Sequence, residues 1–186
     1  MALARRTPIS PPTEAKGDIR GSRHQVPCIL IPMLRRLLKK PADRKVADDV
    51  QKYGWHCLHV SPRLGEVGAS FTYTIGLVAS CEHPELMIFG LERQKSHALL
   101  SESVDMIKAG TRFPVDQPVP DVLARNFHVI FKPIRKDCFS EYLGTAIRYY
   151  GHRNFEAYVL FWPDKNSHFV WESELLSLQA EALNIV

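Results

Sequence analysis

The chain has 186 residues, of which 45% are hydrophobic and 24% are charged, and its formal net charge is +4. This length fits one domain with a short extension, and the composition is that of an ordinary globular protein. A collagen, a coiled coil and a disordered chain are excluded, and four cysteines are too few for a disulfide-stabilised scaffold.

Positive charge is concentrated in residues 1–45. This segment has eleven Lys and Arg against three Asp and Glu, a formal charge of +8, which leaves −4 for the rest of the chain. Its first 25 residues include Pro8, Pro11 and Pro12 and lack apolar periodicity, so we expect a largely flexible basic extension. Such an arm can bind nucleic acid through phosphates, but no aromatic residue is interleaved with its basic ones, which favours a solubilising extension.

Residues 46–186 are predicted to form a single α+β domain. Apolar residues three or four apart indicate helices, and alternating or continuous apolar runs indicate strands. In chain order we expect helices at 29–40 and 42–53, strands at 55–61, 71–77 and 85–91, a helix at 94–109, a loop at 111–120, a strand at 126–134, a helix at 139–150, strands at 157–162 and 169–171, and a helix at 173–183. Strands that cluster with few helices between them favour a mostly antiparallel sheet or a partly open (split) barrel of about five or six strands with two or three flanking helices.

Neither a membrane span nor a signal peptide is expected. The longest apolar stretch, residues 26–34, contains Pro27 and Pro32 and is far shorter than the roughly 20 residues of a spanning helix. Arg5 and Arg6 are followed by prolines and charged residues, where a signal peptide has an apolar run. We therefore expect a soluble, cytoplasmic protein whose cysteines stay reduced.

Several short motifs follow one another through the middle and end of the chain. They are Gly54-Trp55, Phe71-Thr72-Tyr73-Thr74-Ile75-Gly76-Leu77, His83-Pro84-Glu85-Leu86, Phe89-Gly90-Leu91, His97-Ala98-Leu99-Leu100, Trp162-Pro163-Asp164 and Trp171-Glu172. In order and spacing this set, from about residue 48 to residue 172, resembles a bacterial family known as domain of unknown function 4262. The family pattern often has a proline before the last Trp-Glu, where Val170 stands here. The activity of that family is unknown, so the resemblance implies no particular reaction.

A weaker similarity is to flavin-binding split barrels. These also have a Thr-rich strand end, a short loop and a His/Asp-Pro entry to a buried strand, which here would be Tyr73-Thr74-Ile75-Gly76-Leu77 and His83-Pro84-Glu85-Leu86. The similarity implies FMN as the cofactor and an oxidoreductase activity, although a shared fold does not by itself establish a chemistry.

Polar and aromatic residues beside buried strands are the candidate ligand- or partner-binding residues: His83, Glu85, Thr72, Thr74, Trp162 and Trp171. A histidine and a glutamate at a loop-to-strand junction can serve as a general base or bind a ligand, or they can satisfy the backbone of the turn. The threonines lie on one strand face with Gly76, which would let a ligand approach the backbone.

Trp162 and Trp171 can line the binding site of a flat ligand or contact a partner protein, or they can close the edge of the core. We expect His83, Glu85, Thr74 and Trp162 to converge on one pocket.

Cys57, His59, Cys81 and His83 form a second constellation. Residues two apart on a strand point to the same face, so two such pairs side by side could hold zinc with tetrahedral geometry. The spacing is no known zinc signature, and two buried cysteines beside two unrelated histidines are favoured. We therefore predict no metal.

The sequence contains no Gly-x-Ser-x-Gly, Gly-x-x-x-x-Gly-Lys, Gly-x-Gly-x-x-Gly or Cys-x-x-Cys motif. The common α/β-hydrolase, nucleotide-hydrolase, Rossmann and thioredoxin-like classes are therefore not indicated. The leading hypothesis is a soluble bacterial binding or interaction protein whose target is a protein partner or a small ligand. A role in defence or immunity is one form of this hypothesis. The alternative is the flavin-binding oxidoreductase, so the sequence leaves open whether the protein is an enzyme.

Overall fold

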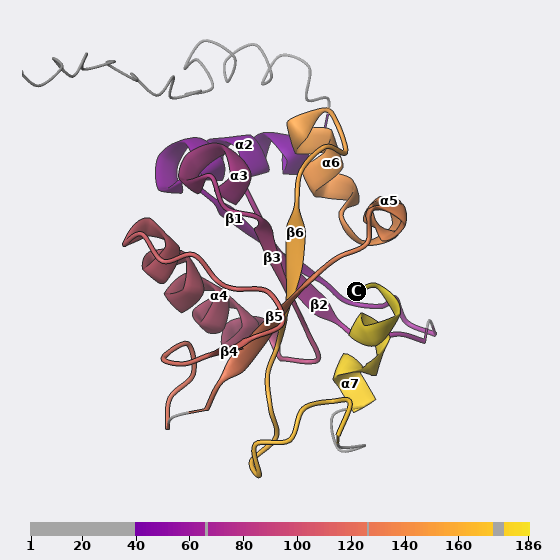
Figure 1. Ribbon diagram of the computed structural model, residues 1–186. Helices are drawn as coiled ribbons and strands as arrows, with labels where there is room; N and C mark the ends of the chain where they lie inside the picture. The colour runs from indigo at the N-terminus through magenta and orange to yellow at the C-terminus, as the bar shows by residue number, and fades with distance from the viewer. Residues whose placement is uncertain (1–39, 66, 126, 173–176) are drawn as a thin grey trace, which may run out of the picture.

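The computed structural model describes residues 40–65, 67–125, 127–172 and 177–186. Six strands form one open sheet in the order β1-β2-β3-β6-β5-β4 (Figure 1). The strands are β1 (His56–Val60), β2 (Phe71–Ile75), β3 (Glu85–Phe89), β4 (Pro118–Val119), β5 (Val129–Pro133) and β6 (Ala157–Phe161). Every neighbouring pair is antiparallel except β3 and β6, which are parallel and occupy the centre of the sheet.

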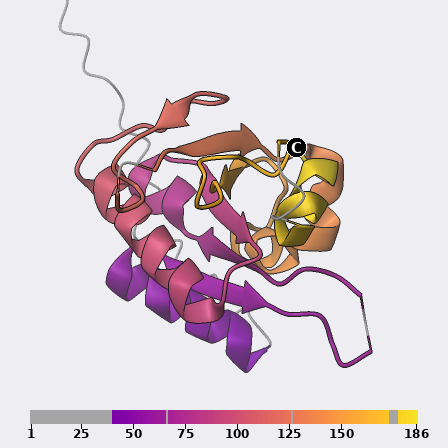
Figure 2. The same cartoon turned by 90° about the horizontal axis from the view of Figure 1, so that it is seen from below.

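Helices cover both faces of this sheet. Helix α4 (Arg93–Lys108) lies on one side, and α5 (Phe139–Tyr142), α6 (Gly144–Tyr150) and α7 (Ser177–Ala180) lie on the other (Figure 1). Figure 2 shows the same layers from below, with the β1–β2 connection reaching away from the sheet. The remaining helices are α2 (Pro41–Tyr53), α3 (Leu77–Cys81), η1 (Lys136–Cys138) and η3 (Glu181–Asn184).

The α+β class with a mostly antiparallel sheet is confirmed, and of the two expected architectures the open sheet is the one observed. The described strands form this open sheet and not the split barrel to which the flavin-binding alternative was similar. In the described part of the chain, no helix is both long enough and apolar enough to span a membrane.

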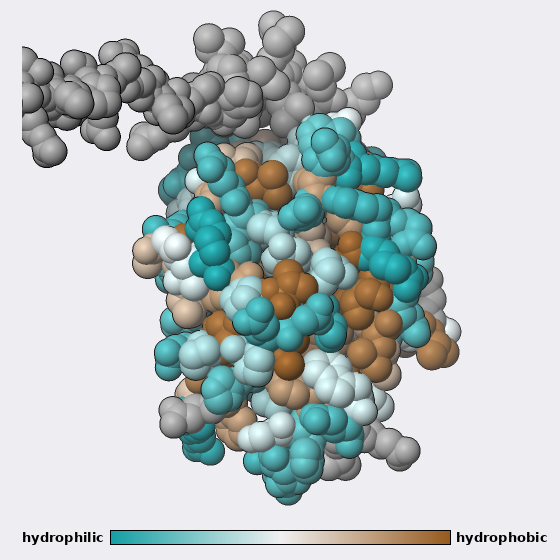
Figure 3. Space-filling view, in the orientation of Figure 1, coloured by the Kyte–Doolittle hydropathy of each residue, from teal (hydrophilic) through white to brown (hydrophobic). Residues whose placement is uncertain are grey.

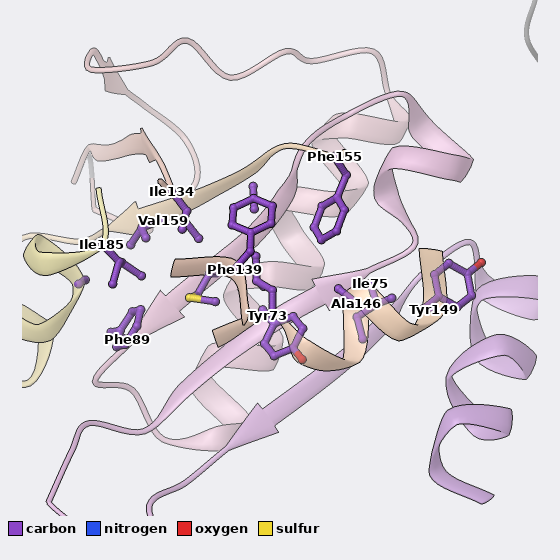
Figure 4. Packing of buried hydrophobic residues seen from close by; sticks show 14 of the residues in the cluster. Tyr73, Ile75, Phe89, Ile134, Phe139, Ala146, Tyr149, Phe155, Val159 and Ile185 are labelled. Carbon is purple, nitrogen blue, oxygen red and sulfur yellow. The ribbon is translucent and has the colours of Figure 1, made fainter. Parts of the chain in front are cut away.

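Two hydrophobic clusters, one on each face, follow from the alternation of side chains along the central strands. On one face Tyr73, Phe89 and Val159 point toward Phe139 of α5 and Ala146 of α6 (Figure 4). On the other face the strands pack against α4, whose buried side chains include Leu99, Leu100, Val104 and Ile107. The central strand β3 is buried along its whole length, as its continuous apolar run predicts.

Helix α2 begins at Pro41, in the first turn, where the missing N–H of proline costs nothing. We expected Pro41 to end a preceding helix at 29–40, but residues 29–39 lie outside the described residues. Asp43, in the first turn of α2, is buried and accepts hydrogen bonds from Arg148 of α6 at 3.0–3.3 Å. Residues 41–45, which the sequence places with the extension, are thus joined to the domain.

Four local expectations are wrong. Residues 118–119, which were expected in a loop at 111–120, form β4 and pair with β5. The second strand was expected to end at Leu77, but β2 ends at Ile75 and helix α3 begins at Leu77, because Gly76 adopts φ +115° and turns the chain. The helix expected at 139–150 is broken at Leu143, with φ −112° and ψ 25°. Residues 169–171 form no strand: the Phe169 amide donates to the Glu172 carboxylate, and the Glu172 amide donates to the Phe169 carbonyl, closing a turn.

Candidate functional site

The side chains of Glu85 and Thr74 are in direct contact where β2 ends and β3 begins. The Thr74 hydroxyl donates to Glu85 Oε2 at 2.6 Å and accepts the Leu86 amide at 2.8 Å. Glu85 Oε1 accepts the Gly76 amide at 2.8 Å and the Tyr150 hydroxyl of α6. The carboxyl group of Glu85 in β3 is therefore hydrogen-bonded to β2, to the turn at Gly76 and to helix α6.

Glu85 is completely buried, and burial raises the pKa of its carboxyl above the usual value, while the hydrogen bonds from Thr74 and Tyr150 oppose this shift. The position that a Cβ of Gly76 would take is 2.8 Å from the methyl groups of Val50. No room is left there for the ligand that we expected to approach the backbone at Gly76. The contacts of Glu85 and Thr74 are those of a structural network.

His83 points away from this network. Its Nδ1–H donates to the Pro84 carbonyl at 2.8 Å, and its ring makes edge contacts with Phe113 at 5.6 Å and Tyr158 at 6.3 Å between centroids. Only 2% of the residue is exposed, and burial lowers the pKa of the imidazole. His83 was considered either as a general base or ligand-binding residue or as a residue that satisfies the turn. Its contacts are those of a packed, hydrogen-bonded side chain.

Thr72 contacts a different partner on the α4 face of the sheet. His59 and Thr72 are directly opposite in the β1–β2 register, and His59 Nδ1 lies 2.7 Å from Thr72 Oγ1. The other ring nitrogen of His59 lies 3.0 Å from Ser61 Oγ. Ser61 was not among the predicted site residues; the only signal in the sequence is its position two residues after His59.

Trp162 lines the candidate ligand pocket, a cavity of about 300 Å³. Its indole Nε1–H donates to the Phe89 carbonyl at 3.1 Å. The side-chain amide of Gln179 accepts from the Trp162 backbone amide at 3.2 Å and donates to the Trp162 carbonyl at 2.9 Å. The other lining residues are Leu91, Lys95, Leu99, Leu123, Phe127 and Pro163. Among the described residues that line this cavity, the walls are apolar and Lys95 is the cationic group.

Trp171 lies in a separate place. It is 41% exposed, stacks on Phe169 with 4.8 Å between centroids, and lines a wider hollow of about 460 Å³ with Leu183 and Val186. Figure 3 shows hydrophobic side chains gathered on the surface beside the C-terminus. The two tryptophans therefore do not wall one ligand.

The expected convergence of four residues on one pocket is wrong. His83 and Glu85 are at the start of β3, whereas Trp162 follows the end of β6. Because β3 and β6 run parallel, with Glu85 opposite Ala157, these positions are at opposite ends of the sheet. Only Thr74 and Glu85 are brought together.

The four zinc candidates are also distributed over separate elements. Cys57 and His59 are on β1, Cys81 ends α3, and His83 packs on Phe113. Within the described ranges, no group of three or more His, Cys, Asp or Glu side chains is arranged to hold a metal ion. Cys57 is half-buried, and its partial burial raises the pKa of its thiol to about 11.

Comparison with known proteins adds a family to this fold. No curated protein and no solved structure gives a significant match to the chain. The family model described as "Domain of unknown function (DUF4262)" matches residues 49–175, a range that begins within α2 and includes all six strands. The chain therefore belongs to the DUF4262 family.

Proposed function

We propose that this domain is a binding protein and that its ligand occupies the Trp162 pocket. The observation that carries the proposal is a cavity of about 300 Å³ with apolar and aromatic walls and one amine, which is the usual composition of a small-molecule site. Of the six predicted site residues, Trp162 is the one that lines this cavity. It stays in the proposal, while the contacts of His83, Glu85 and Thr74 favour structural roles for them.

Position in the fold supports this choice. The pocket lies beyond the carboxyl ends of the parallel strands β3 and β6, next to Leu91 and Pro163, which follow those strands. Ligands of open α/β sheets favour the corresponding place, because loops diverge there above a rigid frame. Gln179 fixes the backbone of Trp162 and the hydrogen bond to the Phe89 carbonyl fixes its ring, so little ordering of this residue is needed when a ligand binds.

The chemistry of the walls defines a ligand class. Trp162 and Phe127 offer aromatic surface to a flat apolar body, and Lys95 offers a positive charge at the rim. Lys95 lies 3.3 Å from Glu92, but both side chains are largely exposed, so this ion pair is weak and an acidic ligand can compete for the amine. We infer a small aromatic or apolar acid as the ligand.

The test uses 8-anilinonaphthalene-1-sulfonate, an aromatic sulfonate whose fluorescence rises in apolar sites. We expect Lys95→Glu to weaken binding to the full chain about tenfold and Phe127→Ala to weaken it further, because one removes the charge partner and the other a wall. Lys165→Glu is the matched control, since Lys165 is exposed in a turn outside the pocket. Binding that depends on Trp171 and is unchanged by Lys95→Glu would place the probe at the other hollow and contradict the proposal.

Two expectations about partners remain predictions. One is a partner protein from a defence or immunity system. The other is contact between nucleic acid and residues 1–45, of which only residues 40–45 are described.

A further inference from the structure

Ser61, His59 and Thr72 form a continuous chain of hydrogen bonds at the end of the edge strand β1. Ser61 Oγ lies 3.0 Å from His59 Nε2, and His59 Nδ1 lies 2.7 Å from Thr72 Oγ1. Ser61 is exposed, His59 is half-buried and Thr72 is fully buried, so the chain runs from solvent into the sheet. An accessible hydroxyl, an imidazole and an inner group that orients the imidazole are the parts of an activated nucleophile.

The surroundings of His59 favour its neutral form. Burial lowers the pKa of the imidazole, and the positive charge of Arg93 at the start of α4 lowers it further. When Nδ1 carries the proton and donates it to Thr72, the lone pair on Nε2 faces the Ser61 hydroxyl. His59 is then placed to accept the Ser61 proton.

A surface hollow of about 390 Å³ lies at the start of α4. Arg93, Gln94 and His97 line it. The charge of Arg93 acts on both Cys57 and His59 of β1, so the Arg93 side of the hollow lies close to the edge strand. It offers space for a substrate and a cation for a developing negative charge.

We propose that Ser61 is the nucleophile and His59 the general base of an acyl-transfer site that accepts small esters. Ser61 Oγ bonds to the ester carbonyl carbon while His59 Nε2 takes the hydroxyl proton. The carbon–oxygen bond to the leaving alcohol then breaks, and that alcohol receives the proton from Nε2. Water attacks the resulting acyl-Ser61 ester, its proton passes through Nε2 back to Ser61 Oγ, and the carboxylic acid leaves.

Thr72 is a positioning residue in this proposal. Its neutral hydroxyl orients the imidazole but cannot stabilise an imidazolium as a carboxylate does. The reaction is therefore slow, and acyl-Ser61 accumulates when an activated ester is supplied. This site is independent of the Trp162 pocket, so each proposal can fail without the other.

The experiment treats the full chain with p-nitrophenyl acetate and maps the acetylated residues by peptide mass spectrometry. We expect acetyl-Ser61 in the wild type, and about 100-fold slower acetylation of Ser61 in His59→Gln, the range for loss of a general base. Thr72→Val, which replaces the hydroxyl with a methyl group, should slow the reaction, and Thr72→Ser, which keeps a hydroxyl, should react faster than Thr72→Val. Ser140, exposed on α5 across the sheet, provides the internal reference, with Ser140→Ala as the matched control for Ser61→Ala.

Melting curves confirm first that each variant is folded. Acetylation of Ser61 no faster than that of Ser140 would overturn the proposal, and so would a rate at Ser61 that does not change in His59→Gln. In either case the hydrogen-bond chain is an ordinary surface feature.

Discussion

The hydroxyl of Tyr150 in α6 donates a hydrogen bond to Oε1 of Glu85 in β3, across 65 residues of chain. The same Oε1 accepts the Gly76 amide, and the Gly76 amide also lies 3.0 Å from the Tyr150 oxygen. These three groups therefore satisfy one another's hydrogen-bonding capacity inside the protein, where an unpaired carboxyl would be destabilising. They fix α6 against the turn between β2 and α3.

Glu85→Gln is predicted to change how stability depends on pH. Burial raises the pKa of Glu85 in the folded state, so the folded chain holds this proton more tightly than the unfolded chain, whose value is near 4.5. The contribution of Glu85 to stability is then fully present below pH 4.5 and is lost as the pH rises through the folded-state pKa. The neutral amide of the variant does not ionise, so the free energy of unfolding of Glu85→Gln should increase relative to that of the wild type as the pH rises.

Urea unfolding of both proteins at several pH values between 4.5 and 8 measures this difference. Groups that titrate in both proteins cancel in the comparison. Parallel stability curves over the whole interval would show that Glu85 ionises as readily in the folded chain as in the unfolded one.

Gly76→Ala is predicted to destabilise the fold strongly. A Cβ there would meet both methyl groups of Val50 at 2.8 Å and the Gly54 carbonyl oxygen at 3.0 Å, and φ is +115°. Gly110→Ala is the matched control, because Gly110 has φ +102° and nothing within 4 Å of its Cβ position. We expect a loss of about 1 kcal/mol at Gly110 from backbone strain, and at least about 2 kcal/mol more at Gly76 from overpacking. Equal losses in urea unfolding would show that Val50 moves aside freely.

Much of the fold can be predicted from the sequence because local patterns determine it. The run Leu86-Met87-Ile88-Phe89 predicts a strand buried on both faces, and β3 is such a strand. Helix α3 could not be predicted, because five residues after a strand are too short for a helical period to show. The break at Leu143 is not indicated by the apolar spacing, which continues through residues 139–150; Gly144, directly after it, is the local signal that disfavours a continuous helix.

Less of the candidate site could be predicted, because pairing between distant strands decides which residues meet. Thr74 is the next-to-last residue of β2 and Glu85 is the first residue of β3, the next antiparallel strand, so their contact follows from a short connection. Trp162 lies far from them because β6 pairs in parallel with β3, and nothing in the local sequence indicates that direction. The partnership of His59 with Thr72 likewise depends on the register of β1 on β2.

Removal of residues 1–39 is predicted to leave stability nearly unchanged, whereas removal of residues 1–45 should lower it. The longer deletion removes Asp43, which is buried against Arg148 with an N–O distance of 3.0 Å, and also the first turn of α2. Arg148 is half-exposed, so the lost pair accounts for only about 1 kcal/mol.

Asp43→Ala in the chain lacking residues 1–39 separates the lost pair from the lost helical turn. Thermal melts of the two truncated chains and of this variant measure both effects. Equal midpoints for the two truncations would show that residues 40–45 add nothing to the domain.

His83→Ala is predicted to destabilise the fold without affecting the Trp162 pocket. The ring of His83 is buried against Phe113 and Tyr158, so its removal leaves a cavity and the Pro84 carbonyl loses its donor. We expect a loss of about 2–3 kcal/mol in free energy of unfolding, against less than about 0.5 kcal/mol for His128→Ala at an exposed position.

The pH dependence gives His83 a second signature. Burial lowers the pKa of His83 in the folded state, so its contribution to stability is present above about pH 6.5, the unfolded value, and is lost as the pH falls through the folded-state pKa. The stability deficit of His83→Ala should therefore shrink as the pH falls below 6.5. At temperatures where the variant is folded, it should bind anilinonaphthalene sulfonate as the wild type does, since His83 lies at the other end of the sheet from Trp162. If His83→Ala were instead as stable as the wild type and bound the probe more weakly, His83 would belong to the ligand site.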